Sequence, residues 1–340
     1  MRLVLLTLGG VVASPLAAQS WTALASGTTA EFRGSHAVDA QVYWAAGRGG
    51  VVAHTADGGA TWRVATIPGA GQLFLVGVRA LDARRAWVVG TAFEGAALGR
   101  IYQTDDGGTT WRQQYENSTA GVFLDGLTFW DARHGIAFGD PQDGKPLVLL
   151  TGDGGAAWRA VPLERFPPML PGEASFAASG SAIVARPPGD VWIVTGGGAW
   201  ARVLHSSDRG EHWQVYATPA SGSAAKGLFG IAAGAGDLLV AVGGDYRSRD
   251  ASVENLLRSE DGGRTWRVSE SPGLQGVQYG VAHAGGAAFV AVGPGGSALS
   301  RDAGRSWTRL DGPGFNTVSC AAEICWAAGV DGRIARFRID

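Results

Sequence analysis

Residues 104–111, Thr-Asp-Asp-Gly-Gly-Thr-Thr-Trp, contain the pattern that decides the fold. In this pattern Ser or Thr is followed by Asp two residues later, by Gly after two more residues and by Trp after a further three. The pattern occurs six times, and successive aspartates are 41 to 55 residues apart. A repeat with this period indicates stacked supersecondary units. The six aspartates are Asp57, Asp106, Asp153, Asp208, Asp261 and Asp302.

Each copy, which we call a box turn, predicts a tight turn between two short strands. The Asp and Ser or Thr side chains can hydrogen-bond to nearby backbone amides, and Gly permits a positive φ angle. The Trp can anchor the outgoing strand in the core. We therefore expect the six box aspartates to be structural.

A second repeated feature has seven copies. Short apolar runs end in a glycine at Gly47, Gly90, Gly139, Gly196, Gly243, Gly293 and Gly329. The chain ends soon after the last run, before a seventh box turn. The segment Ser20–Leu24 contains Trp21, which stands where a box Trp would stand although no box precedes it. A strand from the N-terminus could therefore complete the last unit near Arg333–Ile339 and remove an exposed sheet edge.

The box turn resembles the Asp-box, or bacterial neuraminidase repeat, of β-propellers. Together with the seven glycine-ended runs, the resemblance predicts an all-β protein. We expect a seven-bladed β-propeller of four-stranded blades, closed by pairing of the N-terminal strand with the C-terminal blade. Helical periodicity is absent, and 54 of the 340 residues are glycine, which suits many tight turns.

The N-terminus predicts export. Residues 1–19 have one Arg, an apolar stretch and then small residues, which is typical of a secretory signal peptide cleaved between Ala18 and Trp21. Residues 20–340 would then form a single propeller domain in the periplasm or outside the cell. The apolar stretch is too short to span a bilayer, and no later stretch is long enough. We expect a monomer.

The two cysteines, Cys320 and Cys325, lie in the exported part of the chain, where an oxidising environment favours a disulfide. Facing positions of a hairpin would bring them close enough to bond. A metal pair and a redox site are the alternatives, but no histidines cluster nearby and redox pairs commonly have the spacing C-x-x-C. The formal net charge of −2 provides no basic surface for nucleic acid. We expect no metal and no cofactor.

Candidate site residues should lie on the face opposite the box turns, because loops that enter the innermost strands share that face with loops that join the second and third strands. Aligning the innermost strands places one residue of each blade around the mouth of the central channel, and in blade 4 this strand would run through Ala177 and Ala178. The expected ring is Arg33, Val76, Asp125, Ala177, Phe229, Tyr279 and Thr317.

One function class that this ring allows is a glycoside hydrolase, because sialidases and several polysaccharide-cleaving propellers contain Asp-boxes. A sialidase-like site would use Arg33 to bind a carboxylate and Tyr279 as nucleophile. A two-carboxylate hydrolase would use Asp125 with Glu173 or Glu31. The alternative is that these charged groups only hydrate or pair with one another around the channel.

The long loops of blades 2 to 5 predict a binding surface on the same face. The richest loop, residues 244–255, combines Tyr and Arg, which are favoured at binding hot spots. The binding candidates are Phe93, Asp140, Asp143, Trp200, Asp245, Tyr246, Arg247 and Arg249. Tolerated surface insertions would explain the same loops without a function.

The chain also resembles the family of photosystem II assembly and stability factors and its bacterial relatives. The resemblance lies in residues 85–90 (RAWVVG), 99–111 (GRIYQTDDGGTTW), 123–144 (FLDGLTFWDARHGIAFGDPQDG) and 170–180 (LPGEASFAASG). It implies a non-enzymatic scaffold that holds a protein partner on one face. A glycan is the other ligand class that the sequence allows.

Overall fold

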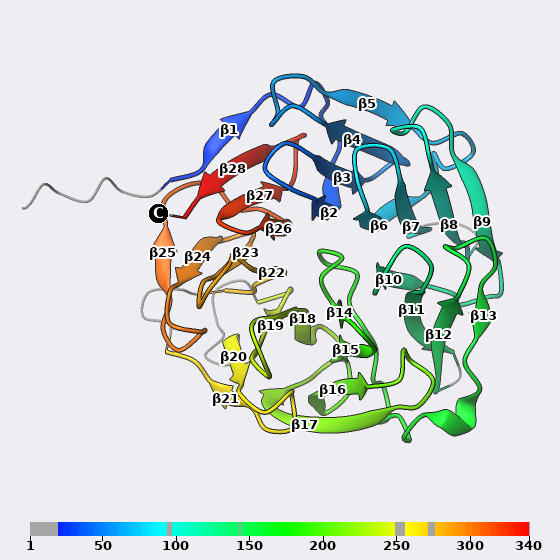
Figure 1. Cartoon of the computed structure of the whole chain (residues 1–340). Helices are drawn as coiled ribbons and strands as arrows, with labels where there is room; N and C mark the ends of the chain where they lie inside the picture. The colour runs from blue at the N-terminus through cyan, green and yellow to red at the C-terminus, as the bar shows by residue number, and fades with distance from the viewer. Residues whose placement is uncertain (1–19, 94–96, 143, 249–255, 271–275, 340) are drawn as a thin grey trace, which may run out of the picture.

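The computed structural model describes residues 20–93, 97–142, 144–248, 256–270 and 276–339. The described residues form seven four-stranded sheets arranged as a ring of blades around a central channel (Figure 1). Within each sheet, neighbouring strands are antiparallel and follow one another in sequence, apart from the closing blade. The predicted seven-bladed β-propeller is confirmed.

The blades are numbered in chain order, and each begins with its innermost strand. Blade 1 contains β2 (Phe32–Ala37), β3 (Tyr43–Gly47), β4 (Val51–Thr55) and β5 (Arg63–Thr66). Blade 2 contains β6 (Phe74–Ala80), β7 (Ala86–Thr91), β8 (Gly99–Thr104) and β9 (Arg112–Asn117). Blade 3 contains β10 (Leu124–Phe129), β11 (Gly135–Gln142), β12 (Lys145–Thr151) and β13 (Arg159–Ala160). A short 3-10 helix, η1 (Leu163–Arg165), leads to blade 4, which contains β14 (Ile183–Arg186), β15 (Asp190–Val194), β16 (Trp200–Ser206) and β17 (Gln214–Ser221).

The remaining blades have the same plan. Blade 5 contains β18 (Lys226–Ala233), β19 (Leu239–Asp245), β20 (Leu256–Ser259) and β21 (Arg267–Val268). Blade 6 contains β22 (Gly280–His283), β23 (Phe289–Gly293), β24 (Gly296–Ser300) and β25 (Thr308–Leu310). Blade 7 contains β26 (Thr317–Ala321), β27 (Ile324–Ala328), β28 (Ile334–Arg338) and, from the N-terminus, β1 (Thr22–Leu24).

The ring closes as the sequence predicts. Strand β1 pairs antiparallel with β28, with Ala23 opposite Ala335. The Trp21 side chain packs 5.0 Å from the Phe315 ring, and its Nε1 donates a hydrogen bond to Ser297 of blade 6 at 2.7 Å. The N-terminal segment therefore joins the last blade and contacts the blade before it.

The expected disulfide is present in blade 7. Cys320 and Cys325 face each other on β26 and β27, with their Cα atoms 4.0 Å apart, and are bonded to each other. Because the bond links two neighbouring strands of one hairpin, it acts as a local staple.

At four of the seven apolar runs, those that end at Gly47, Gly139, Gly243 and Gly293, the final glycine is explained by a close approach of the backbone. A Cβ atom at Gly47 would lie 2.1 Å from the carbonyl oxygen of Glu31, which precedes the innermost strand. The same clash, at 2.1 Å, would occur between a Cβ at Gly139 and the carbonyl oxygen of Phe123. No side chain fits at this distance, so glycine at these positions allows the second strand of the blade to lie close to the backbone at the start of the first.

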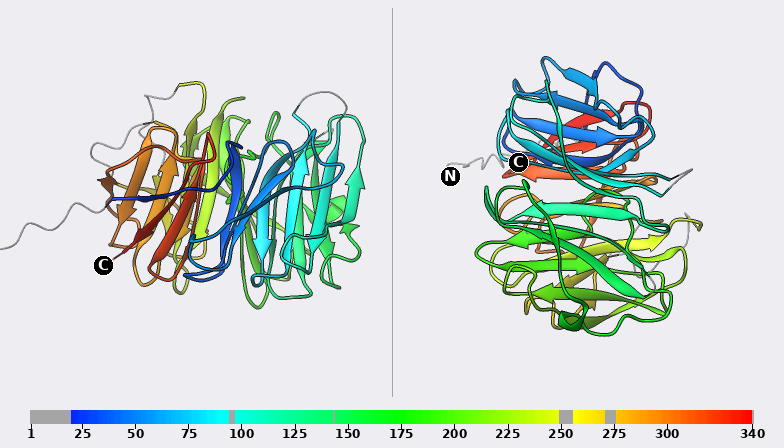
Figure 2. Two further views of the ribbon diagram at one scale, coloured as in Figure 1. Left: turned by 90° about the horizontal axis from the view of Figure 1, so that it is seen from above. Right: turned by 90° about the vertical axis from the view of Figure 1, so that its right-hand side faces the viewer.

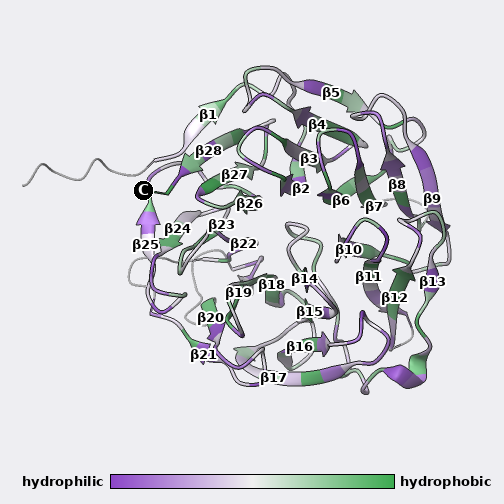
Figure 3. Ribbon diagram, in the orientation of Figure 1, coloured by the Kyte–Doolittle hydropathy of each residue, from purple (hydrophilic) through white to green (hydrophobic). Residues whose placement is uncertain are grey.

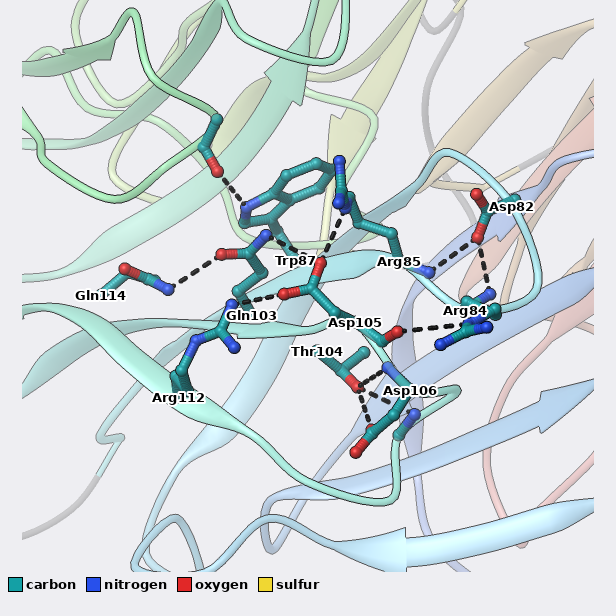
Figure 4. A network of polar contacts seen from close by, with 12 residues as sticks. Asp82, Arg84, Arg85, Trp87, Gln103, Thr104, Asp105, Asp106, Arg112 and Gln114 are labelled. Carbon is teal, nitrogen blue, oxygen red and sulfur yellow. Dashed lines mark hydrogen bonds and ion pairs between the residues drawn. The ribbon is translucent and has the colours of Figure 1, made fainter.

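Each box turn is held by the same hydrogen bonds. In blade 2, Thr104 Oγ1 donates to Asp106 Oδ1 at 2.9 Å and accepts from the Gly108 amide at 2.9 Å (Figure 4). Asp106 also accepts from the Thr110 amide and hydroxyl, and these bonds lower the pKa of Asp106 to about 2. The other five box turns repeat the bonds to the hydroxyl and to the Asp.

Side chains around the box turns also link neighbouring blades. Trp87 of β7 is fully buried, and its Nε1 donates to the carbonyl oxygen of Gly154, which lies in the box turn of blade 3, at 3.0 Å (Figure 4). In blade 5, Gly262 accepts from the Nε1 of Trp192 of blade 4 at 2.9 Å. The box turns thus lie in a bonded network between blades, which supports a structural role for their aspartates.

The strands run roughly along the channel axis, so the turns gather on two opposite faces (Figure 2). We call the face with the box turns the box face and the opposite one the loop face. The inner strands are mostly apolar, whereas outer strands such as β9 are polar (Figure 3). Among the described residues, no helix has the length and apolar character needed to cross a membrane.

Candidate functional site

A segment of blade 4 enters the central channel. Residues 174–182, which we call the plug, leave the blade and reach the centre of the ring (Figure 1). Ser179 accepts a hydrogen bond at its carbonyl oxygen from the Thr317 hydroxyl of blade 7 at 2.8 Å. The Ser181 carbonyl accepts one from the Ile231 amide of blade 5, also at 2.8 Å. The plug therefore contacts blades on different sides of the channel.

The plug corrects one expectation from the sequence. The innermost strand of blade 4 does not run through Ala177 and Ala178 but begins at Ile183. Gly180 has a φ of +71°, and a Cβ there would lie 2.9 Å from the carbonyl oxygen of Val76 in blade 2. A run of small residues that includes this glycine can therefore turn inward and fit against the other innermost strands.

The plug divides the channel into two cavities. On the loop face, a cavity of about 460 Å³, which we call the mouth cavity, has Ser175–Ala178 of the plug in its lining. A second cavity of about 290 Å³ opens toward the box face, where Ser179 and Gly180 form part of its wall. The mouth cavity has the size of many ligand pockets, and it lies on the face where the sequence predicts function.

Aromatic rings dominate the wall of the mouth cavity. Phe93 of the loop between β7 and β8 meets Phe123 edge to face at 5.0 Å between ring centroids. Phe176 of the plug lies 4.4 Å from Phe229 of β18. Tyr246, which follows β19, is 6.1 Å from Phe176 and 37% exposed. The lining residues with aromatic rings are Phe93, Phe123, Phe176, Phe229, Tyr246 and Tyr279.

Arg33 of β2 lies at the cavity wall with its charge partly compensated. Its guanidinium is 3.3 Å from Glu31 and lies over the rings of Phe74 and Tyr279, at 5.1 and 5.9 Å from their centroids. Glu31 also pairs with Arg48 at 3.6 Å. Two of the hydrolase candidates, Arg33 and Tyr279, are therefore brought together in the mouth cavity, and Glu31 lies behind Arg33 rather than in the lining.

Asp140, in the last part of β11, lines the cavity on the blade 3 side. Its Oδ1 accepts a hydrogen bond from the Ser175 amide of the plug at 2.9 Å. Burial raises the pKa of Asp140 to about 6, against the opposing effect of this hydrogen bond. The carboxylate is therefore charged at neutral pH, and its burial then lowers the stability of the folded protein by more than the hydrogen bond from Ser175 restores.

Asp125 of β10 lies beneath the cavity and is not in its lining. Its side chain is fully buried, and neither carboxylate oxygen has a hydrogen-bond partner among the described residues. Burial, and then the charge of Asp140, raise the pKa of Asp125 well above its usual value. Both effects favour the protonated form of Asp125.

Glu173 does not join the other candidate carboxylates in the mouth cavity. Its side chain is fully buried and forms a bidentate ion pair with Arg202 of β16, with a Nε to Oε1 distance of 2.9 Å. It also accepts from the Thr195 hydroxyl at 2.7 Å and from the Leu170 amide at 2.8 Å. These contacts hold the Pro-rich loop before the plug against blade 4, so Glu173 has a structural environment.

The predicted binding residues are only partly gathered. Phe93, Asp140 and Tyr246 line the mouth cavity, whereas Arg247 lies beside it with its guanidinium 5.7 Å from the Tyr246 ring centroid. The Asp245 carboxylate accepts from the Arg247 amide at 2.8 Å and shapes this turn. Trp200 is 55% exposed but is not in the cavity lining. Asp143 and Arg249 lie outside the described residues.

Sequence reasoning missed the role of Phe176 and of the Ser175 amide, which the plug delivers to the cavity. The signal for them was the small-residue run 177–182 after a Pro-rich loop, which breaks the pattern of the other innermost strands. Within the residues that the structure describes, no three His, Cys, Asp or Glu side chains gather as a metal site would require.

Comparison with known proteins shows the fold. No protein-family model matches the chain, and no curated protein matches it. A solved structure of YCF48 bound to D1 peptide is similar, with a TM-score of 0.68 and 17% identity over 97% of this chain and 100% of that one. YCF48 from Cyanidioschyzon merolae has a TM-score of 0.68 and 16% identity, covering 94% of this chain and 99% of that one. Virginiamycin B lyase from Staphylococcus aureus has a TM-score of 0.67 and 12% identity with the same coverage.

Proposed function

We propose that this protein is an exported, non-enzymatic propeller that binds a segment of another protein at the mouth cavity on its loop face. The observation that carries the proposal is the aromatic wall of that cavity, in which Phe93 and Tyr246 remain 45% and 37% exposed. Large aromatic side chains bury much apolar surface with little loss of conformational entropy, so they are typical anchors for protein partners.

Two further observations support this proposal. The sequence resembles the photosystem II assembly and stability factor family, and a solved structure with the same fold holds a peptide. The box turns form hydrogen bonds between neighbouring blades, as from Trp87 to Gly154. The mouth cavity, in contrast, is open to a partner. We also propose that the box turns are Asp-box repeats and that the chain is related to the assembly-factor family.

The glycoside hydrolase is the weaker candidate on the same residues. Its carboxylate pair, Asp125 with Glu173, is not assembled in the cavity, because Asp125 is enclosed and Glu173 is paired with Arg202. Glu31 is likewise paired, with Arg33 and Arg48. A catalytic acid must reach the substrate, and none of the three lines the open cavity.

Site-specific photo-crosslinking in the cells that produce the protein tests the proposed function. A crosslinking amino acid at Phe93 or at Tyr246 should trap a protein partner, whereas the same amino acid at exposed Arg264 in the box turn of blade 5 should trap none. Equal crosslinking from both faces, or crosslinking from the box face alone, would contradict the proposal.

Enzyme assays and N-terminal sequencing test the other parts. A panel of aryl sialosides and other aryl glycosides should show no turnover. Turnover that disappears in Asp125→Asn or Glu173→Gln would instead establish a hydrolase. Export predicts a mature N-terminus between Ala18 and Trp21, and a mature protein that begins at Met1 would contradict it.

A further inference from the structure

Among the described residues, the lining of the mouth cavity contains an acidic group without a cationic partner, Asp140, and a second unpaired carboxylate, Asp125, is buried outside the lining. Neither Asp140 nor Asp125 takes part in an ion pair within the described part of the chain, and Asp140 receives a single hydrogen bond there, from the Ser175 amide. Buried or half-buried carboxylates are normally paired with a cation or saturated with hydrogen bonds. The cavity therefore lacks the positive charge that its acidic side would attract.

The cation in the cavity wall does not supply this charge. The Arg33 guanidinium is drawn toward Glu31, at 3.3 Å, and rests on the rings of Phe74 and Tyr279. No ion pair joins it to Asp140 in the described residues. The cavity is thus polarised, with an uncompensated carboxylate on the blade 3 side and an already engaged arginine on the blade 1 side.

The aromatic wall selects the kind of cation. Rings of Phe176, Phe229 and Tyr246 pack tilted or edge to face, with centroids 4.4 to 6.4 Å apart, on the blade 4 and blade 5 sides of the cavity. Such rings favour organic cations, whose charge is attracted to the ring faces and whose carbon atoms make apolar contacts. A hydrated metal ion would need more oxygen ligands, and no third acidic or histidine side chain joins Asp140 and Asp125 among the described residues.

We infer that the mouth cavity binds a cationic side chain, lysine or arginine, that a partner protein inserts between the aromatic rings so that its charged end reaches the Asp140 carboxylate. The inference rests on the proposed function, because it takes the cation from a bound protein segment. It adds the chemical class of the residue recognised. The cavity volume of about 460 Å³ falls within the range of pockets that enclose a ligand group.

The charge of Asp140 is unfavourable in the unbound protein, and a bound cation would stabilise it. Burial raises its pKa to about 6, and Asp125, whose pKa burial also raises, supplies no positive charge that would compensate the carboxylate. A bound ammonium or guanidinium group would stabilise the ionised carboxylate, and the charge-assisted hydrogen bond would be shielded from water by the surrounding rings.

Selection of short random peptides on the purified protein tests the inference. Peptides captured at pH 7.5 should be enriched in Lys and Arg, and replacing the enriched residue by norleucine should weaken binding about tenfold or more. Asp140→Asn should remove the enrichment, because it keeps the shape of the side chain and the acceptor for the Ser175 amide but not the charge.

Two further variants control the experiment. Glu116 lies on β9, the outer strand of blade 2, away from the cavity, and pairs there with Arg100 of β8. Glu116→Gln should leave the enrichment unchanged. Tyr246→Leu keeps Asp140 but removes one ring, and should weaken binding of the basic peptides a few-fold. A lack of effect of both Asp140→Asn and Tyr246→Leu would overturn the inference.

The remaining outcomes separate the inference from the proposed function. Capture of peptides that are acidic or apolar, with no preference for Lys or Arg, would overturn the inference while protein binding stands. If no peptide is captured but acetylated lysine amide or arginine amide shifts the NMR signals of the cavity in an Asp140-dependent way, the cation site stands, its ligand is a free small molecule, and the proposed function fails. If neither probe binds, both are wrong.

Discussion

Replacing Asp140 by Asn should stabilise the protein at neutral pH, and the size of the effect follows from the cavity. Burial raises the pKa of Asp140 from 3.8 to about 6 in the folded state. A difference of about two pH units between folded and unfolded states corresponds to about 3 kcal/mol. Because one side of the carboxylate faces the open cavity, solvent screening reduces the expected gain to about 2 kcal/mol.

The sign of the pH dependence is determined by which state binds the proton more tightly. Between about pH 4 and pH 6 the folded protein binds more protons at Asp140 than the unfolded chain does, so the contribution of Asp140 to stability falls as pH rises through this range. Asn cannot ionise and shows no such loss. The two proteins should therefore have similar stability at pH 3.5 and differ by about 2 kcal/mol at pH 7.5.

Urea denaturation of both proteins over this pH range provides the measurement. The difference between variant and parent isolates the effect of removing the Asp140 charge, because all other titratable groups are present in both proteins. Glu116→Gln should leave the free energy of unfolding unchanged within about 0.5 kcal/mol, as is usual for an exposed surface position. If Asp140→Asn is no more stable than the parent at pH 7.5, or if the difference does not change with pH, the account of this carboxylate is wrong.

Three further predictions concern the scaffold. Trp213→Ala should lower the free energy of unfolding by about 3–5 kcal/mol, and Asp208→Ala should also lower the melting temperature, both without selective loss of peptide binding. Unchanged stability with lost binding would contradict the assignment of a structural role to the box face and a binding role to the loop face. The unreduced, denatured protein should contain no free thiol, and reduction of the Cys320–Cys325 bond should cost about 2 kcal/mol, whereas two titratable thiols before reduction would refute the bond. Gly180→Val should disrupt the plug, because the φ of Gly180 is +71° and its surroundings leave no room for a Cβ atom. We expect a loss of stability of about 1–3 kcal/mol together with weaker ligand binding at the mouth cavity. A fully stable variant with normal binding would show that the plug can move aside.

The sequence alone determined the architecture because the features that build it are local. The hydroxyl, carboxylate and glycine of a box turn bond to one another within five residues, as in Thr104 to Gly108, so the turn can be recognised from its letters. The glycine-ended runs are equally local, and comparing their number with the number of boxes was enough to predict closure through Trp21. The cysteine pair was predictable for the same reason, since a hairpin brings near neighbours together.

The functional face was predicted, but its composition was decided by tertiary structure. Phe93, Asp140 and Tyr246 come together with Arg33 and Tyr279 only because blades distant in sequence meet around the channel. The letters of the sequence do not distinguish an enclosed carboxylate from an open one.

The plug is the clearest case of a feature that only the tertiary structure decides. Its hydrogen bond from Thr317 to Ser179 joins residues 138 positions apart in the sequence. Whether a run of small residues continues a strand or fills a channel depends on the space that the other six blades leave for it. That space is set by packing between distant segments, which no local pattern encodes.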